Sequence, residues 1–317
     1  MKYKISALLL LICVSFSTLS TTSSAIEISS EAGETTVVSS YNYLQCDYET
    51  RKTTEYHSPV FNQAIETWDL FDARQVYAMN EAASCLTNPG SPLSPTTILG
   101  EDNRFLSPPT APPYSSVACL VASFDTDGDG VANTTSYGTG FLVSKNVLVT
   151  AAHCLIPKDT SSTALIELKI YFDLHDNSLV GHSYEHPRRW TWSVNWHDVA
   201  NGWQYDYCVI ELHNDISRPY YFNCVSSSNA QTPQNIYASG YPGDNTHYQM
   251  SSYGQLTQTT YYSCRYNNDI LPGMSGGPLY NNNCIGIITY EASTFNQGNL
   301  FTPYLFNLIC SKISDNQ

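Results

Sequence analysis

From residue 98 onward, short apolar runs alternate with residues that favour turns. Runs rich in Val, Ile, Leu, Tyr and Phe, bounded by Gly, Pro, Asn and Asp, are typical of β-strands. Many short strands without helices between them favour an antiparallel barrel or sandwich, so we predict an all-β domain. The predicted strands are Val117 to Phe124, Gly140 to Val143, Val147 to Thr150, Leu165 to Phe172, Cys208 to Leu212, Ile236 to Gly240, Ile285 to Tyr290 and Leu300 to Thr302.

Helical spacing of apolar residues occurs on both sides of this region. Residues 303–313 predict a terminal helix, and residues 62–84 predict an amphipathic helix with Ile65, Trp68 and Phe71 on one side. Residues 88–95 are rich in Pro, Gly and Ser and form a breaker-rich link. We interpret residues 26–97 as a partly helical pro-segment. The alternative is an ordinary extension of the domain that follows.

The first 25 residues have the pattern of a secretory signal peptide. Lys2 and Lys4 form its charged start, Ile5 to Phe16 its apolar stretch, and Ser23 to Ala25 a cleavage site of small residues. The apolar stretch is too short to span a bilayer. We therefore expect a secreted protein that has no membrane anchor once the signal is removed.

Cysteine usage agrees with export. After residue 25 the cysteines number nine, and most of them should form disulfide bonds in an oxidising compartment. An odd number leaves at least one cysteine unpaired or bonded to a second chain. The pattern does not determine which cysteines pair.

The charge balance is strongly acidic. The formal net charge is −14, and the loss of Lys2 and Lys4 with the signal would make it −16. Nucleic-acid binding requires a basic face, so this class of partner is excluded. We expect a soluble monomer that self-repulsion keeps apart from other copies.

Three chemically distinctive residues occur in the order His, Asp, Ser. They are His153 in the run TAAHC, Asp206 in the run YDYCVIEL, and Ser275 in the run GMSGGP. A serine hydroxyl becomes a good nucleophile when an imidazole removes its proton, and a carboxylate must orient that imidazole. The sequence therefore contains the components of a nucleophilic triad.

Glycines surround the candidate nucleophile. They allow backbone amides to converge on one point, so the N–H groups of Gly273 and Ser275 are a predicted oxyanion hole. A glycine-rich turn without chemistry is the simpler alternative. The run also matches the nucleophile elbow of α/β-hydrolases, but that fold needs a histidine after the serine. The last histidine is His247, which excludes the elbow.

Taken together, these runs resemble the trypsin-like serine peptidases of the chymotrypsin fold. The runs GTGFLV at 138–143, SGYPG at 239–243 and GMSGGP at 273–278 follow the family order, and the resemblance extends over about 98–313. It implies two six-stranded antiparallel β-barrels, at about 98–212 and 213–302, with the site between them. It also implies that His153 is the general base and then acid, that Asp206 orients it, and that Ser275 attacks the acyl carbon of a polypeptide substrate.

A narrower resemblance is to secreted glutamyl endopeptidases. It rests on residues 98–104, 239–243 and 294–302. It implies a zymogen whose mature chain, residues 98–317, begins near Ile98.

At two positions the residue differs from the one found in the families that the sequence resembles. Met274 stands where trypsin has the Asp of its activation ion pair, and Ile288 stands where glutamyl endopeptidases have a histidine that binds the substrate's acidic side chain.

The substrate-binding residues are predicted near the end of the chain. We expect the strand with Thr289, Tyr290 and Glu291 to line the cleft, with Asp269 near the base of the specificity pocket. Two carboxylates without a histidine would favour a basic residue before the cleaved bond. Because Asp also stands at the position of Asp269 in glutamyl endopeptidases, and because Glu291 could equally be a solvated surface residue, specificity stays open.

Two patterns suggest metals, and neither is adopted. Asp125, Asp127 and Asp129 resemble the first half of a calcium loop, but Asp-Gly repeats also form tight turns. The run HSYEH at 182–186 matches a zinc motif that requires a helix, and its flanking Gly181 and Pro187 predict a loop. We expect no cofactor, with structural calcium as the alternative.

Two functions from different classes follow from these observations. The first is a secreted serine endopeptidase made as a zymogen. The second is a catalytically silent binding protein, an adhesin or decoy, on the same fold. Proteins of the second kind usually lack a member of the triad, and His153, Asp206 and Ser275 are all present.

Overall fold

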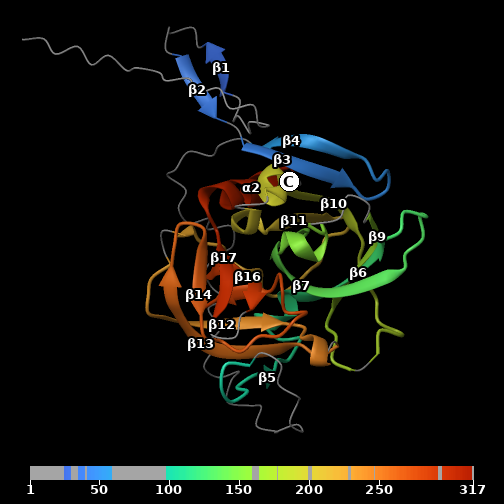
Figure 1. The fold of residues 1–317 in the computed structure, drawn as a ribbon, viewed down its shortest axis with the longest axis vertical. Coiled ribbons are helices and arrows are strands. Elements are labelled where there is room, and N and C mark those ends of the chain that lie inside the picture. Colours follow the sequence, from blue (N-terminus) through green and yellow to red (C-terminus); the bar gives the residue numbers. More distant parts are fainter. Residues whose placement is uncertain are drawn as a thin grey trace, which may run out of the picture.

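The structure is a computed structural model that describes residues 25–29, 35–39, 41–58, 98–158, 164–176, 178–198, 202–227, 230–245, 247–291 and 295–315. The predicted helix at 62–84 and nearly all of the signal peptide lie outside these residues. The strands of the described part are β1 (Ala25–Ser29), β2 (Thr35–Ser39), β3 (Tyr41–Asp47), β4 (Thr53–Ser58), β5 (Phe105–Leu106), β6 (Val117–Asp125), β7 (Thr134–Ser144), β8 (Val147–Thr150), β9 (Ala164–Phe172), β10 (Pro187–Ser193), β11 (Cys208–Leu212), β12 (Gln234–Gly240), β13 (Met250–Thr259), β14 (Ser263–Tyr266), β15 (Pro278–Tyr280), β16 (Cys284–Glu291) and β17 (Asn296–Leu300). The α-helix α2 (Pro303–Ser314) follows them, and Figure 1 shows the arrangement.

The first large sheet contains β3, β4 and β6 to β11, whereas β1 and β2 form a separate two-stranded sheet. Its order is β4-β3-β10-β11-β8-β7-β6-β9, and its neighbouring strands are antiparallel. The last six strands of this order run from β10 to β9. An isolated antiparallel bridge between Ile170 of β9 and Glu185, just before β10, joins the two ends of this run. These six strands form the first barrel, and β3 and β4 extend its sheet beyond β10.

The second large sheet contains the strands after residue 233 together with β5. Its order is β12-β15-β16-β17-β14-β13-β5, and an additional antiparallel pairing of β12 with β13 closes a ring of six strands. The two sheets lie side by side in Figure 1, with β6 to β11 in green to olive and β12 to β17 in orange to red. The predicted all-β chymotrypsin-like architecture with a C-terminal helix is confirmed.

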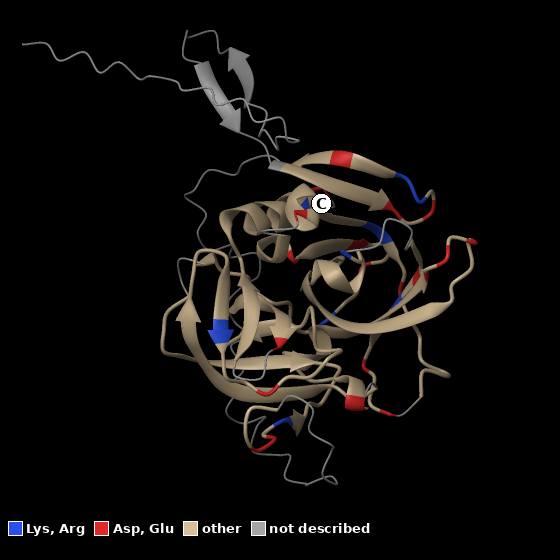
Figure 2. Cartoon of the chain, viewed as in Figure 1, with Lys and Arg blue, Asp and Glu red and all other residues tan. Residues whose placement is uncertain are grey.

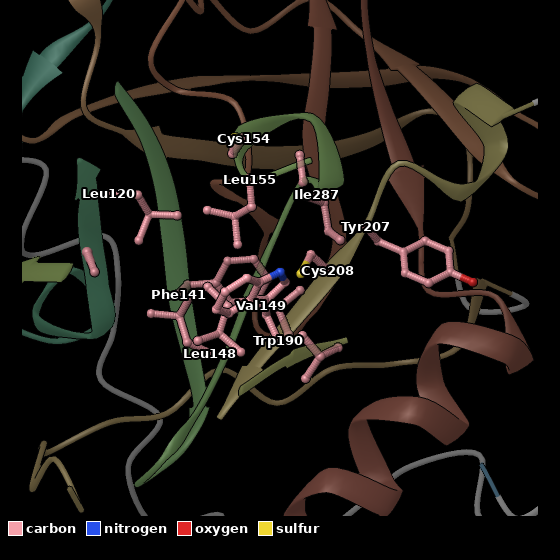
Figure 3. Packing of buried hydrophobic residues seen from close by; sticks show 14 of the residues in the cluster. Leu120, Phe141, Leu148, Val149, Cys154, Leu155, Trp190, Tyr207, Cys208 and Ile287 are labelled. Atoms are coloured by element: carbon pink, nitrogen blue, oxygen red, sulfur yellow. The ribbon is translucent and has the colours of Figure 1, made fainter. Parts of the chain in front are cut away.

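Apolar side chains from both barrels meet in the core. Figure 3 shows Phe141, Leu148 and Val149 of the first barrel packed around Trp190. Ile287 of β16 belongs to the same cluster, so the core continues from one barrel into the other. A separate apolar cluster fills the second barrel. Side chains of this size contribute about 1.5–3 kcal/mol each when fully buried.

Helix α2 begins at a recognisable sequence signal. The side chain of Thr302 accepts a hydrogen bond from the amide of Leu305 at 3.4 Å, and Pro303 occupies the first helical position. Leu305, Leu308 and Ile309 are buried on the side that faces the barrels. The predicted helix at 303–313 is therefore confirmed to within one residue.

The sequence pattern did not predict strands β1 to β5, β10 and β13 to β15, and the strand predicted at Leu300 to Thr302 lies earlier, as β17, which ends at Leu300. Strand β13 has the sequence MSSYGQLTQT, which is polar at most positions because one of its faces is open to solvent. Strands β3 and β4 lie in residues 26–97, which we interpreted as a partly helical pro-segment. Their hairpin adds to the edge of β10, so its stability depends on distant residues that local periodicity cannot reveal.

Acidic residues outnumber basic residues along the chain. Figure 2 shows that Asp and Glu are spread over loops and strands, with few Lys and Arg between them. The eight cysteines in the described residues are all buried and form no disulfide bond with one another, so the predicted disulfide bonds are not seen there. In the same part of the chain, no helix combines the length and apolar character needed to span a membrane.

Candidate active site

His153 and Asp206 are neighbours because of the pairing between two strands. His153 lies in the 3₁₀ turn Ala152–Cys154 directly after β8, and Asp206 lies two residues before β11. In the antiparallel register Cys208 is opposite Thr150, so the end of β8 and the start of β11 meet. The pairing of β8 with β11 therefore brings together two side chains that are far apart in the sequence.

The Asp206 carboxylate binds His153 with both oxygens. Oδ1 accepts the backbone amide of His153 at 2.9 Å, and Oδ2 lies 2.7 Å from the ring Nδ1. The Asp206 side chain is 9% exposed and that of His153 is 35% exposed. This geometry holds the Nδ1–H tautomer, which leaves Nε2 free to accept a proton.

The same contact changes the basicity of the imidazole. Burial by itself would lower the pKa of His153, but the negative charge of Asp206 and the hydrogen bond to it act in the opposite direction and outweigh burial. The pKa of His153 is therefore raised well above its usual value. A raised pKa makes the ring a stronger base toward a nearby hydroxyl.

Two successive turns shape the loop that carries Ser275. The amide of Met274 donates to the carbonyl of Leu271 at 3.0 Å, and the amide of Gly277 donates to the carbonyl of Met274 at 3.0 Å. In each turn the third residue is a glycine with positive φ, +97° for Gly273 and +87° for Gly276. Type II turns require this conformation at that position, which glycine adopts without strain.

The loop packs tightly against the first barrel. A Cβ atom on Gly276 would lie 2.1 Å from the carbonyl oxygen of Thr139. The carbonyl of Ser275 accepts the amide of Thr139 at 2.8 Å and the thiol of Cys154, the residue after His153, at 3.5 Å. The Ser275 loop of the second barrel is thereby held against the strand and turn that flank His153.

The Ser275 hydroxyl makes no hydrogen bond to His153 within the described residues. Hydrogen bonds between a nucleophile and its base are often long before substrate binds, and they tighten in the substrate complex. What the structure establishes is that the backbone of Ser275 is anchored next to the His153 turn.

Backbone amides of the same loop divide into two groups. The amides of Met274, Gly276 and Gly277 donate to carbonyls, with Gly276 bound to Ile288 at 2.7 Å. Across the described part of the chain, the amides of Gly273 and Ser275 have no acceptor from the protein. They are the two groups that the sequence predicted as an oxyanion hole, and they are the ones left to bind a ligand oxygen.

Thr139 holds the two barrels together at the site, a role that the pattern analysis did not assign. Its hydroxyl donates to the carbonyl of Gly273 at 2.8 Å and accepts the amide of Tyr241 at 3.0 Å. Its carbonyl accepts the hydroxyl of Thr150 at 2.7 Å. In the sequence, Thr139 stands out only as part of the run GTG at 138–140, because a single Thr does not indicate a contact with distant residues.

The Asp269 carboxylate is buried, and both of its oxygens accept hydrogen bonds from backbone amides of residues 99–103. Its Oδ1 accepts the amide of Leu99 at 3.1 Å, and its Oδ2 accepts the amide of Asn103 at 2.9 Å. Burial raises the pKa of this carboxyl group, against the lowering effect of the two amides. Both oxygens thus serve residues 99–103 instead of pointing unoccupied into a pocket.

The other predicted substrate-binding residues lie on β16 beside the Ser275 loop. Ile288 exchanges backbone hydrogen bonds with Gly276 and Gly277, at 2.7 and 2.8 Å. The next residue, Thr289, is buried, whereas the side chain of Tyr290 projects outward at 59% exposure. Glu291 ends the strand and is half-buried. The strand therefore runs alongside Ser275, and its last two residues reach the surface.

The calcium-like pattern begins at Asp125, the last residue of β6, and continues into the turn after it, whereas the zinc-like pattern lies in a loop. The oxygens of Asp125, Asp127 and Asp129 come within 4.8 Å of one another. Asp125 also accepts the amides of Gly128 at 2.6 Å and Gly130 at 2.7 Å, so the turn is closed by its own backbone. Residues 182–186 contain no helix, as the flanking residues predicted.

Comparison with known proteins identifies the domain. Residues 138–287 match the family model of the trypsin-like peptidase domain. The chain contains a trypsin-like peptidase domain. Its predicted class, a hydrolase of peptide bonds, and the resemblance to trypsin-like serine peptidases are confirmed.

Individual relatives of this peptidase are distant. An "Extracellular metalloprotease" of Bacillus subtilis (strain 168) is 29% identical over 235 residues, which span 68% of this chain and 70% of that protein. A solved Glu endopeptidase in complex with MPD has a TM-score of 0.57 at 22% identity, over 68% of this chain and 100% of its own. The protease Anisep from Arthrobacter nicotinovorans has a TM-score of 0.51 at 14% identity, over 65% and 98%. These structures show the fold.

Proposed function

We propose that the chain is a secreted serine endopeptidase that uses His153, Asp206 and Ser275 and proceeds through an acyl-enzyme. The observation that carries this proposal is the two-point hydrogen bonding of Asp206 to His153, beside a loop that holds Ser275. A half-buried imidazole with an oriented carboxylate behind it and a serine anchored next to it suits acyl transfer.

The proposed reaction begins with proton transfer from Ser275 Oγ to Nε2 of His153. The oxygen then bonds to the substrate carbonyl carbon, and Asp206 stabilises the imidazolium that has formed. The imidazolium gives the proton to the departing amine, and the C–N bond breaks to leave an ester on Ser275. Water, deprotonated by His153, hydrolyses that ester and restores the hydroxyl.

The negative oxygen that forms in this reaction needs hydrogen-bond donors. The amides of Gly273 and Ser275 are proposed to bind it, because they lack protein acceptors in the described residues whereas their neighbours have them. The rigid turns around them mean that little reorganisation is required during the reaction. Removing a donor of this kind typically costs about 10²–10³ in kcat.

Export and maturation are part of the same proposal. Residues 1–25 have the pattern of a signal peptide, and the relative from Bacillus subtilis is named as extracellular. Maturation near Ile98 would release a new N-terminus one residue before Leu99, whose amide binds Asp269. Since Met274 replaces the Asp used by trypsin, we propose that Asp269 holds the start of the mature domain in place.

Substrate contacts are proposed for the end of β16. Thr289, Tyr290 and Glu291 run beside the Ser275 loop and could pair with an extended peptide. The oxygens of Asp269 are taken by backbone amides, so its charge is a weak argument for a basic residue at the cleaved bond. The preferred substrate residue stays open.

The test is a serine-reactive phosphonate applied to the matured protein, together with casein hydrolysis. We expect covalent labelling at Ser275 and its loss in Ser275→Ala, with kcat lowered by several orders of magnitude because triad members act as a unit. Ser183→Ala, which removes an exposed hydroxyl in the loop before β10, is the matched control and should behave as wild type. Near-normal hydrolysis by Ser275→Ala would overturn the triad. Absence of labelling and hydrolysis in the matured wild type would favour a silent binding protein.

A further inference from the structure

The N-terminal hairpin of β3 and β4 is built into the first barrel. Five residues of β3 pair with β10, from Tyr43 opposite Ser193 to Asp47 opposite Arg189. Tyr43 and Cys46 are buried and belong to the main apolar cluster. The hairpin precedes the proposed maturation point near residue 98, yet its contacts are those of a domain core.

The hairpin also covers one side of α2. The Tyr43 hydroxyl donates to the carbonyl of Tyr304 at 2.7 Å, and the Tyr56 hydroxyl donates to Oγ of Ser311 at 3.0 Å. Ser58 is fully buried against the same helix. Figure 1 shows β3 and β4 in blue beside α2 in dark red.

A buried cation connects the hairpin to the helix and the barrel. Nζ of Lys312 on α2 lies 3.4 Å from Oε2 of Glu211, and the two side chains are 1% and 0% exposed. The same ammonium donates to Oε1 of Gln45 and lies 3.3 Å from the centre of the Tyr56 ring. Gln45 and Tyr56 both belong to the hairpin. Without it, the buried Lys312 would lose an acceptor and an aromatic face, a costly change for a charge held away from water.

The hairpin also reaches Tyr207, the residue that follows Asp206. Tyr207 and Tyr43 both belong to the main apolar cluster, and Tyr43 is opposite Ser193 in the pairing of β3 with β10. Tyr207 is fully buried. The position of β3 is therefore coupled to the backbone that presents Asp206 to His153.

From these contacts we infer that residues 41–58 stay bound to the peptidase after maturation and are a permanent part of it. This inference rests on the proposed maturation near residue 98. Hydrolysis of one peptide bond between residues 58 and 98 adds one water and leaves a carboxylate and an amine. The product is a two-chain enzyme in which the N-terminal fragment keeps its place at the edge of β10. The peptidase domain accordingly begins at residue 41 and not at residue 98.

The experiment uses the full chain in the Ser275→Ala background, with a recognition sequence for a site-specific protease placed at residues 91–97. After cutting, size-exclusion chromatography in native buffer separates bound from released fragment. We expect the two fragments to elute together in equal amounts and to separate only in denaturant. Release of the N-terminal fragment in native buffer would overturn the inference, whatever the state of the remaining chain.

A matched pair of hairpin variants tests whether the named contacts are responsible. Tyr56→Ala removes the ring over Lys312 and should raise the dissociation rate of the cut fragment at least about tenfold, as expected for a half-buried aromatic anchor that contacts a buried charge. Thr54→Ala on the same strand changes an exposed side chain and should stay within about twofold of the parent. Equal dissociation rates for the two variants would contradict the assigned contacts.

Failure of this inference and failure of the proposed function give different results. Docking is measured with Ser275→Ala, so it needs no catalysis. Labelling by the phosphonate is measured separately on the matured wild type. A fragment that stays bound to the cut Ser275→Ala protein, while the wild type never reacts with the phosphonate, would contradict only the catalytic proposal. A fragment that leaves the cut Ser275→Ala protein, while the wild type reacts with the phosphonate, would contradict only the docking.

Discussion

Replacement of Asp206 by Asn is the sharpest test of the site's geometry. The side-chain oxygen of Asn can still accept the backbone amide of His153, as Oδ1 does now at 2.9 Å. Its NH₂ group must then occupy the position of Oδ2, 2.7 Å from Nδ1 of the ring. A donor at that point requires Nδ1 to be unprotonated, which moves the proton to Nε2. The imidazole can then no longer take the proton of Ser275.

The magnitude follows from the charge that is lost. Opposite unit charges about 4 Å apart attract by about 4 kcal/mol at an effective dielectric of about 20. The imidazolium formed in the transition state loses this attraction, which lowers the rate by about 10³. The wrong tautomer lowers it further, so we expect kcat/KM to fall by about 10³–10⁴.

The assay is hydrolysis of a chromogenic peptide or of casein, with the active enzyme counted by the phosphonate. Asp215→Asn makes the same chemical change in an exposed ion pair with Lys145, and it should leave kcat/KM unchanged. The thermal unfolding temperature of the Asp206→Asn protein should show that it is folded. A folded Asp206→Asn enzyme within tenfold of wild type would refute the assignment of Asp206.

Three further predictions concern acidity, loop packing and oxidation. Because the pKa of His153 is raised and the neutral ring is the active form, kcat/KM should fall as the pH drops through a value above 6.5; a profile of log(kcat/KM) against pH with an acid limb at or below 6.5 would contradict this. In Gly276→Ala a Cβ would meet the carbonyl of Thr139 at 2.1 Å and the positive φ would be strained, so kcat/KM should fall at least about 100-fold, and a fully active variant would show that the loop can move. Cys224 and Cys284 are opposite each other in a parallel bridge and both are buried, so we expect them to form a disulfide if the chain is exported as proposed; recovery of both as alkylated thiols without prior reduction would disprove it.

The triad candidates could be found from the sequence because short runs of residues determine their local settings. The turn around Ser275 needs glycine at the positions that Gly273 and Gly276 occupy, and both have positive φ. His153 follows an apolar strand, and Asp206 precedes another. Strands such as β8 and β11 were predicted with their observed limits because they are apolar on both faces.

The specificity residues could not be assigned in the same way. Asp269 suggested a pocket base by its spacing from Ser275, but its partners are the amides of Leu99 and Asn103, some 170 positions away in the chain. A carboxylate has the same appearance in a sequence whether it binds substrate or backbone. Only the folded chain shows which groups satisfy its oxygens.

By itself the sequence determined the all-β class and the C-terminal helix and supplied the candidate residues for nucleophilic chemistry, because turns, alternation and capping act over a few neighbouring residues. The tertiary structure decided how these parts work together: the pairing of β8 with β11 that brings Asp206 to His153, and the position of the hairpin at residues 41–58. That hairpin is polar in sequence and becomes part of the core only because β10, α2 and the buried Lys312 supply its partners. Contacts between distant segments depend on the whole fold, so no local pattern could have placed it.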